Sequence, residues 1–307
     1  MTLTLGLSVT ADEVTAAVVD AAGAIQEGSR RAAHAASPDE LAVAAAALVT
    51  DLRRAHDVVG LGIGVLYPSI TAPGGSGPEG SLPLNLQRLT DLPTVVEPAG
   101  RCMAWAEYRF GAARGTSNSV FVGVADGIDG GMVLDGALQH GSGGRSAQFG
   151  HMRVAPEGRR CPCGNRGCWQ QYAGGRALVL GVLEYATTED LGTVDELLIR
   201  DDQARAGSAA EDVLAAARAG NRVANSVRDD VARWLGSGLA GLTSILDPDV
   251  LVLGGLITRE GADLLAPTTA AFLASLPAAG MRPIAAIRQA ELGDDATVLG
   301  AADLVRS

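Results

Sequence analysis

Lysine is absent from this chain of 307 residues, and all 24 of its basic side chains are arginines. Catalysis through a lysine Schiff base and phosphate binding by a P-loop lysine are therefore excluded. Aromatic residues make up only 4% of the chain. No apolar run approaches the roughly 18 residues of a membrane helix, and the N-terminus has no basic region or cleavage signature. We therefore expect no association with a membrane.

Cysteines and clustered positive charges are also scarce. Three of the four cysteines lie together in the sequence, which argues against a disulfide scaffold and for a reducing cytoplasm. The formal net charge is −11, whereas a nucleic-acid surface needs clustered cations to displace counterions. We expect a cytoplasmic protein without a nucleic-acid partner. Its hydrophobic content of 47% suits a large α/β core with room for two lobes.

The most specific local pattern places one histidine and three cysteines within eighteen residues: His151, Cys161, Cys163 and Cys168. A Cys₃His set suits tetrahedral Zn²⁺, and four protein ligands are typical of a structural site. Pro162 stiffens the Cys-Pro-Cys turn, and the two glycines at 164 and 167 allow the chain to bring Cys168 back. A set of buried cysteines without a metal is the alternative.

Hydrophobic periodicity and turn residues predict alternating strands and helices. The strands are expected at 3–9, 13–20, 24–27, 59–66, 94–97, 118–124, 131–134, 137–139, 250–253 and 284–289. The helices are expected at 37–55, 101–112, 170–186, 194–200, 209–219, 222–246, 261–276 and 296–306.

Several motifs, in this order, resemble those of the ROK family (repressors, open reading frames and sugar kinases). They are AWAE at 104–107, GAARG at 111–115, GIDGG at 127–131, the segment 143–175 with its cysteines, ILDPDVLVLGG at 245–255 and LGDDATVLGAA at 292–302. The resemblance covers essentially the whole chain. It implies an α/β fold of the actin-like/ribonuclease-H-like ATPase type, with two lobes around a cleft. Residues 1–114 would form a small lobe to which a terminal helix at 295–307 returns, and residues 115–294 a large lobe carrying the zinc segment.

The resemblance also implies a class of chemistry. Active members of the family use ATP and Mg²⁺ to phosphorylate hexoses or N-acetylhexosamines, and repressor members add an N-terminal winged helix. Because this sequence starts directly at its first strand, we expect no winged helix. Family members are commonly dimers, so the resemblance also implies a homodimer.

The position of the family's catalytic base is changed in this sequence. Kinases of the family carry Glu-Asn-Asp-Ala-Asn after the strand that corresponds to 94–97, and its Asp takes the proton of the sugar hydroxyl. Here the segment is Glu97-Pro-Ala99-Gly-Arg101, and alanine cannot accept a proton. Losing a positioned base typically lowers the rate roughly 10²–10⁴-fold.

The loops that hold phosphates in the family are changed as well. The family's Asp-x-Gly-Gly-Thr becomes Ser8-Val-Thr-Ala-Asp12, without the glycines that let backbone N–H groups close on a phosphate. The second loop has Asp126 and Asp129 where small or hydroxyl residues are usual, and two carboxylates beside a triphosphate are costly without Mg²⁺. The resemblance assigns five remaining glycines to nucleotide binding: Gly127, Gly130, Gly131, Gly254 and Gly255.

The positions that hold the sugar in the family are changed more conservatively. The family's Gly-Glu-x-Gly-His is Ala-Gln148-Phe-Gly-His151 here, and its Cys-x-Glu is Cys-Trp-Gln170. Glutamine keeps the reach of glutamate and still forms hydrogen bonds, but it lacks the charge. With Asn85 and Glu97, these three residues complete the set that the resemblance assigns to a sugar-like ligand.

We weigh three hypotheses. The main one is a catalytically impaired sugar-kinase homologue, a pseudokinase, that binds a sugar or sugar-like ligand through structural zinc and an inherited site. The second is an active ATP- and Mg²⁺-dependent kinase of hexoses, aminosugars or cyclitols, with Asp126, Asp129 or Glu97 as a relocated base. The third is a regulator-derived protein without its DNA-binding domain.

Overall fold

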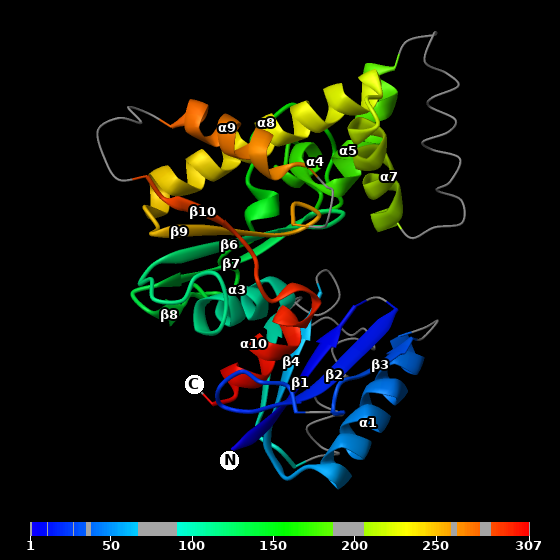
Figure 1. Cartoon of the computed structure of the whole chain (residues 1–307), viewed down its shortest axis with the longest axis vertical. Helices are drawn as coiled ribbons and strands as arrows, with labels where there is room; N and C mark the ends of the chain where they lie inside the picture. Colours follow the sequence, from blue (N-terminus) through cyan, green and yellow to red (C-terminus); the bar gives the residue numbers. More distant parts are fainter. Residues whose placement is uncertain are drawn as a thin grey trace. The chain divides into compact units, whose positions relative to one another are not determined.

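The structure is a computed structural model that describes residues 2–10, 12–26, 28–34, 38–66, 91–186, 206–258, 263–276 and 284–306. Contacts divide the chain into two units. The first unit comprises residues 1–116, 131–133 and 291–307, and the second comprises residues 117–130 and 134–290. Each unit holds a five-stranded sheet with helices packed on it (Figure 1).

The sheet of the first unit has the order β3-β2-β1-β4-β5. Its strands are β1 (Leu3–Val9), β2 (Glu13–Val19), β3 (Arg31–His34), β4 (Val58–Val65) and β5 (Thr94–Pro98). β1 pairs antiparallel with β2 and parallel with β4, which pairs parallel with β5. The third strand was predicted at 24–27, and that prediction is wrong. Among the described residues 24–26, Ile25 alone forms a bridge, to Val19, and the chain pairs with β2 later, at β3.

Helices cover both faces of this sheet. On one face, α1 (Pro38–Ala55) places Leu41, Ala45, Val49 and Leu52 in a core with side chains of β1, β2 and β4. On the other face lie α3 (Ala99–Arg109), the short 3₁₀ helix η4 (Gly293–Asp295) and α10 (Ala296–Leu304). The backbone of α10 comes so close that a Cβ at Gly62 would lie 1.8 Å from the carbonyl oxygen of Ala301. Glycine is therefore required on β4 at this contact.

The sheet of the second unit has the order β10-β9-β6-β7-β8. Its strands are β6 (Ser119–Val124), β7 (Ile128–Leu134), β8 (Ala137–Leu138), β9 (Val250–Gly255) and β10 (Ala286–Gln289). β9 pairs parallel with both β6 and β10. Both neighbours of β9 are thus parallel, which agrees with its nearly continuous run of buried aliphatic residues.

The longest helix, α8 (Arg222–Leu246), organises the helical layer of the second unit. It packs against α4 (Gln170–Ala173), α5 (Gly175–Tyr185), α7 (Ala206–Arg218) and α9 (Leu265–Ser275). The Asn221 side chain caps its N-terminus by accepting a hydrogen bond from the amide of Ala224 at 3.0 Å. Trp169 lies fully buried against Gly238 of this helix and donates its indole N–H to the Trp234 carbonyl at 2.7 Å.

One helix predicted over 170–186 is divided into α4 and α5. Gly174 leaves the helical region, with φ −84° and ψ 170°. The amide of Gly175 then donates to the carbonyl of Ala125 at 2.7 Å, so α5 begins against the loop that follows β6. Single-sequence periodicity does not show this break, because the bond joins segments fifty residues apart. The helix predicted at 194–200 lies outside the described residues.

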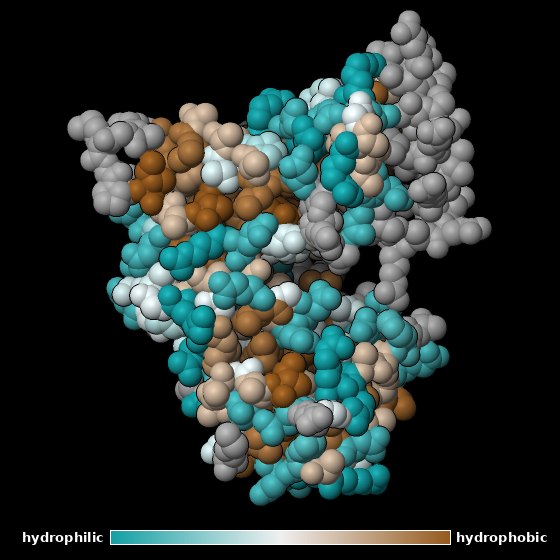
Figure 2. All heavy atoms as spheres, viewed as in Figure 1, coloured by the Kyte–Doolittle hydropathy of each residue, from teal (hydrophilic) through white to brown (hydrophobic). Residues whose placement is uncertain are grey.

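Hydrophobic residues reach the surface in several places. Figure 2 shows them gathered over α9, where Leu273 is 43% exposed. None of the helices in the described part of the chain combines the length and the apolar character needed to cross a bilayer.

Candidate metal centre and ligand-binding residues

The four residues of the Cys₃His pattern come together in the second unit. Their ligand atoms all lie within 4.8 Å of one another, with His151 on the 3₁₀ helix η1 (Phe149–His151) and the cysteines on the segment before α4. The His151 Nδ1 atom is 3.8 Å from Cys161 Sγ, and Cys163 Sγ is 3.6 Å from Cys168 Sγ.

The backbone of this segment explains how the cysteines converge. The amide of Cys161 donates to Asn165 O at 2.9 Å, and the amide of Gly164 donates to Cys161 O at 3.0 Å. Gly164 and Gly167 have φ of +91° and +73°. Both glycines therefore adopt the left-handed conformations that the sequence predicts for the turns.

The separations of 3.8 Å between His151 and Cys161 and 3.6 Å between Cys163 and Cys168 fit a tetrahedral zinc ion. With Zn–S bonds of about 2.3 Å, the ligand atoms of a tetrahedron lie about 3.6–3.8 Å apart. Burial lowers the pKa of His151, although Asp129 opposes this shift, and a lowered pKa favours the neutral imidazole that binds a metal. Burial raises the pKa of Cys168 to about 12, and hydrogen bonds with Cys163 and Cys161 add to the shift. Without a cation, this thiol therefore keeps its proton, and metal binding has to displace it.

Gln170 lies beside the Cys₃His cluster and beside the loop between β6 and β7. Its Nε2 atom is 3.5 Å from Cys161 Sγ, and its Oε1 atom is 3.0 Å from the position that a Cβ on Gly127 would take. A Cβ on Gly150 would approach the same oxygen to 2.6 Å. The structure thus places Gln170 between two other predicted ligand residues or their neighbours: Gly127 lies beside its side-chain oxygen, and the Cys₃His cluster that contains His151 lies beside its nitrogen.

The neighbouring residue Gln171 is a site feature that sequence reasoning missed. It is only 6% exposed, and its Nε2 atom lies 3.7 Å from Cys161 Sγ. The only available signal was its place directly after Gln170, in the turn that follows Cys168. By contrast, Gln148 is exposed and immediately precedes η1, where its carbonyl accepts from the His151 amide at 3.0 Å.

Glu97 lies in the first unit, at the end of β5, and is held by an arginine. Arg101 Nε is 2.9 Å from Glu97 Oε2, and the two side chains are only 7% and 13% exposed. Between them in the chain, Ala99 opens α3 and is 4% exposed. The ion pair was missed from sequence, although its i,i+4 spacing was a possible signal.

The turn between β1 and β2 is closed by its own side chains. Thr10 Oγ1 accepts from the amide of Glu13 at 3.1 Å and donates to Asp12 Oδ1 at 3.2 Å, while the amide of Thr10 donates to Glu13 O at 2.9 Å. Two amides that a phosphate-binding turn would offer are therefore engaged within the hairpin.

The five glycines assigned to nucleotide binding meet close neighbours. A Cβ at Gly130 would lie 2.5 Å from the Phe149 ring, and one at Gly131 would lie 2.5 Å from the Ala104 side chain. A Cβ at Gly254 would lie 2.9 Å from the Phe121 ring. Gly255 has a φ of +72°, and a Cβ there would lie 2.1 Å from Val124 O. Packing alone accounts for glycine at these positions, so their presence does not by itself indicate a nucleotide. Asn85 lies outside the described residues.

Comparison with known proteins identifies the family. The model of the ROK family matches residues 4–307. The chain belongs to the ROK family. A glucokinase of Streptomyces coelicolor is 34% identical over 316 residues that cover 100% of this chain and 98% of the relative. An N-acetylmannosamine kinase of Escherichia fergusonii is 31% identical, covering 99% and 98%.

A solved structure confirms the predicted fold of this ROK protein. The ROK glucokinase of Streptomyces griseus, solved in complex with glucose and AMPPNP, superposes with a TM-score of 0.82 at 35% identity, covering 99% of both chains. The prediction of an actin-like α/β fold is thereby confirmed, and the chain is a homologue of ROK sugar kinases. These relatives favour the active-kinase hypothesis over the impaired one, and they do not test whether this chain has lost activity.

Proposed function

We propose that this ROK protein binds a hexose-like sugar and transfers phosphate to it slowly or not at all. The observation that carries the proposal is Ala99, a buried methyl group at the position where the family's kinases have their aspartate base. The predicted sugar ligands are Gln148, His151 and Gln170 of the second unit, with Glu97 and Asn85. Their amides and imidazole would donate and accept hydrogen bonds with sugar hydroxyls.

The carboxylates available as substitutes for the base are poorly suited to that role. Glu97 is engaged by Arg101 in a buried ion pair. Asp129 accepts a hydrogen bond from the amide of Gly130 at 2.8 Å, and Asp126 is exposed. A general base has to reach the hydroxyl and be free to take its proton. The partners of Glu97 and Asp129 therefore support impairment over a relocated base at either of these two positions.

The phosphate-binding residues also fit ATP poorly. The amides of Thr10 and Glu13 are used within the β1–β2 hairpin, and Asp12, Asp126 and Asp129 add negative charge beside the loops that hold phosphates in the family. We therefore derive no transfer step for this chain. In an active protein, Mg²⁺ would have to offset the charge of these carboxylates.

Zinc has a structural part in this proposal. His151 and the three cysteines would hold it, and zinc would fix the segment that carries Gln170 beside the β6–β7 loop. The metal supplies a rigid cross-link with four protein ligands, and its role is independent of phosphoryl transfer.

An active ATP-dependent sugar kinase is the second candidate. It is favoured by the 34% identity with the Streptomyces coelicolor glucokinase and by the 35% identity with the glucose-bound Streptomyces griseus enzyme. We also expect a homodimer in the cytoplasm, by analogy with the family, and light scattering of the purified protein tests the dimer.

Two measurements on the zinc-loaded protein decide between the candidates. Calorimetric titration with glucose, N-acetylmannosamine and a cyclitol tests sugar binding, and a coupled ADP-release assay with ATP-Mg²⁺ tests transfer. We expect binding of at least one sugar, with transfer at least about 10²-fold slower than in the Streptomyces coelicolor glucokinase. A comparable rate would establish the active kinase, and failure of every sugar to bind would overturn the proposed ligand class.

The predicted role of Gln170 in sugar binding can be tested against a matched control. Gln170→Ala should weaken binding of the selected sugar about tenfold, since it removes hydrogen bonds in a partly buried place. Gln289→Ala makes the same change at an exposed position on β10 and should leave the affinity unchanged. Equal affinities in both variants would remove Gln170 from the sugar site.

A further inference from the structure

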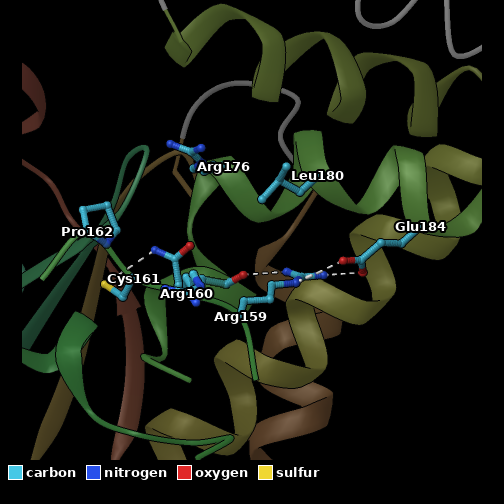
Figure 3. A pocket seen from close by; sticks show the side chains of 8 residues that line it. Arg159, Arg160, Cys161, Pro162, Arg176, Leu180 and Glu184 are labelled. Carbon is cyan, nitrogen blue, oxygen red and sulfur yellow. Dashed lines mark hydrogen bonds and ion pairs between the residues drawn. The ribbon is translucent and has the colours of Figure 1, made fainter. Parts of the chain in front are cut away.

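The second unit contains a cavity that the proposed sugar site does not include. Its volume is about 470 Å³, within the range of small-molecule sites. One wall is a face of α5 with Arg176, Leu180 and Glu184 at intervals of four residues, and the other wall is the cysteine segment with Arg159, Arg160, Cys161 and Pro162 (Figure 3). The buried Gln171 completes the lining.

One of the three arginines is fixed by protein groups. Arg159 forms an ion pair with Glu184 and donates from Nη1 to Gln171 O at 2.5 Å. Its guanidinium lies 4.8 Å from the centre of the Tyr172 ring. Figure 3 shows this side chain directed along the cavity to Glu184. Among the described residues of the lining, Glu184 is the only carboxylate, and its charge is offset by Arg159.

The other two arginines leave positive charge uncompensated. Arg160 and Arg176 are exposed, and neither forms an ion pair with a residue in the described part of the chain. Both residues line the cavity, Arg160 from the cysteine segment and Arg176 from α5. In a protein of net charge −11, a cavity with two unopposed guanidinium groups is a local reversal of sign, and such a field concentrates anions.

We propose that this cavity binds a small phosphomonoester. Two arginines match the charge of a phosphomonoester at neutral pH, since its second pKa is about 6, and planar guanidinium groups can each donate two hydrogen bonds to phosphate oxygens. Leu180 and Pro162 provide apolar surface for the carbon part of the ligand. The inference does not rest on the proposed sugar binding or on kinase activity, because none of the five residues predicted to bind sugar lines the cavity.

Calorimetric titration of the zinc-loaded full chain tests this inference. The probes are glycerol 3-phosphate, inorganic phosphate, succinate and glycerol. We expect one molecule of glycerol 3-phosphate to bind, with inorganic phosphate weaker because it lacks the carbon part. Arg160→Gln and Arg176→Gln should each weaken glycerol 3-phosphate about tenfold, because each removes charged hydrogen bonds.

Arg218→Gln is the matched control, since Arg218 is an exposed arginine of α7 in the same unit that does not line the cavity. Its affinity for glycerol 3-phosphate should equal that of the parent protein. Absence of binding, or equal weakening in all three variants, would overturn the proposal. Tighter binding of succinate than of glycerol 3-phosphate would indicate a dicarboxylate ligand, and this result would also overturn the proposal. Thermal unfolding of each zinc-loaded variant verifies that the change has not unfolded the protein.

Discussion

Ala99 and Arg101 lie two positions apart at the start of α3, and together they change the chemistry of this segment. A methyl group replaces the proton acceptor of the family's kinases, while a buried arginine pairs with the carboxylate of Glu97. The segment has lost its base at position 99, and its remaining acid, Glu97, is paired with a guanidinium group. It can therefore still hold a ligand, but it is poorly able to accept a proton.

Restoring the acid at position 99 tests how much this single side chain limits transfer. Ala99→Asp should raise the rate of ADP release with the selected sugar at least about tenfold, because a carboxylate at this position can act as base. Ala99→Asn has the same shape without the basicity and should leave the rate at the parent level. Equal rates in the two variants would show that another step limits the reaction.

The buried ion pair can be tested by stability. Arg101→Met should lower the free energy of unfolding by about 3 kcal/mol, because it removes a guanidinium group that lies 2.9 Å from the largely buried Glu97 carboxylate. The double variant with Glu97→Gln should recover part of this loss. Urea unfolding of both single variants and the double variant measures the coupling between the two residues. Additive losses would contradict an interacting pair.

At the scale of elements, the Cys₃His segment and the α10 contact show how far sequence reasoning extends. The four residues of the Cys₃His cluster are predictable because all of them lie within one short segment, so spacing and residue type specify them. The partners of Gly62 are not predictable, since Ala301 lies more than 230 positions away in the sequence. For the same reason the sequence did not reveal that the amide of Gly175 bonds to Ala125 and divides α4 from α5. Strand β3 was misplaced because its residues are mostly exposed and lack an apolar alternation.

Metal removal tests the cysteine segment. The purified protein should contain about one equivalent of zinc, and Cys161→Ser should reduce this to less than half. Cys102→Ala changes the cysteine outside the cluster and should retain the metal. Metal analysis by mass spectrometry measures both. Retention of a full equivalent by Cys161→Ser would contradict the proposed ligand set.

The contact between α10 and β4 has a matched control within the chain. Gly62→Ala should lower the free energy of unfolding by about 2–3 kcal/mol, because its Cβ would clash with the backbone of α10. Gly241→Ala places the same methyl group on α8, where no atom lies within 4 Å, and should raise stability by up to about 1 kcal/mol through helix propensity. Chemical denaturation measures the free energy of unfolding of both variants and therefore shows whether the two changes have opposite signs.

At the scale of the whole molecule, the first unit is discontinuous. Its sheet uses strands from the first 98 residues, yet α10, close to the other end of the sequence, covers one face of that sheet. The side chains buried there include Val19, Ala106, Val298 and Ala302. The second unit, in contrast, draws nearly all its residues from one continuous stretch, 134–290.

Shortening the chain tests this division. A chain that ends at residue 290 lacks η4 and α10, so amides of β1 and β4 should exchange with solvent much faster than in the full chain, because one face of their sheet is uncovered. Amides of β9 and α8 should keep most of their protection. Hydrogen exchange read by mass spectrometry gives both values, and equal loss in the two units would contradict independent packing.

The position of α10 also bears on how the protein is made. A ribosome releases residues 117–290 before residues 296–304, so the second unit can complete its core while the β1–β4 sheet still lacks its cover. During that interval the part of the sheet that α10 later covers, with Gly6 and Gly62, is open to water and to other nascent chains. The first unit, although its strands are synthesised first, therefore completes its packing only after the second unit has been synthesised.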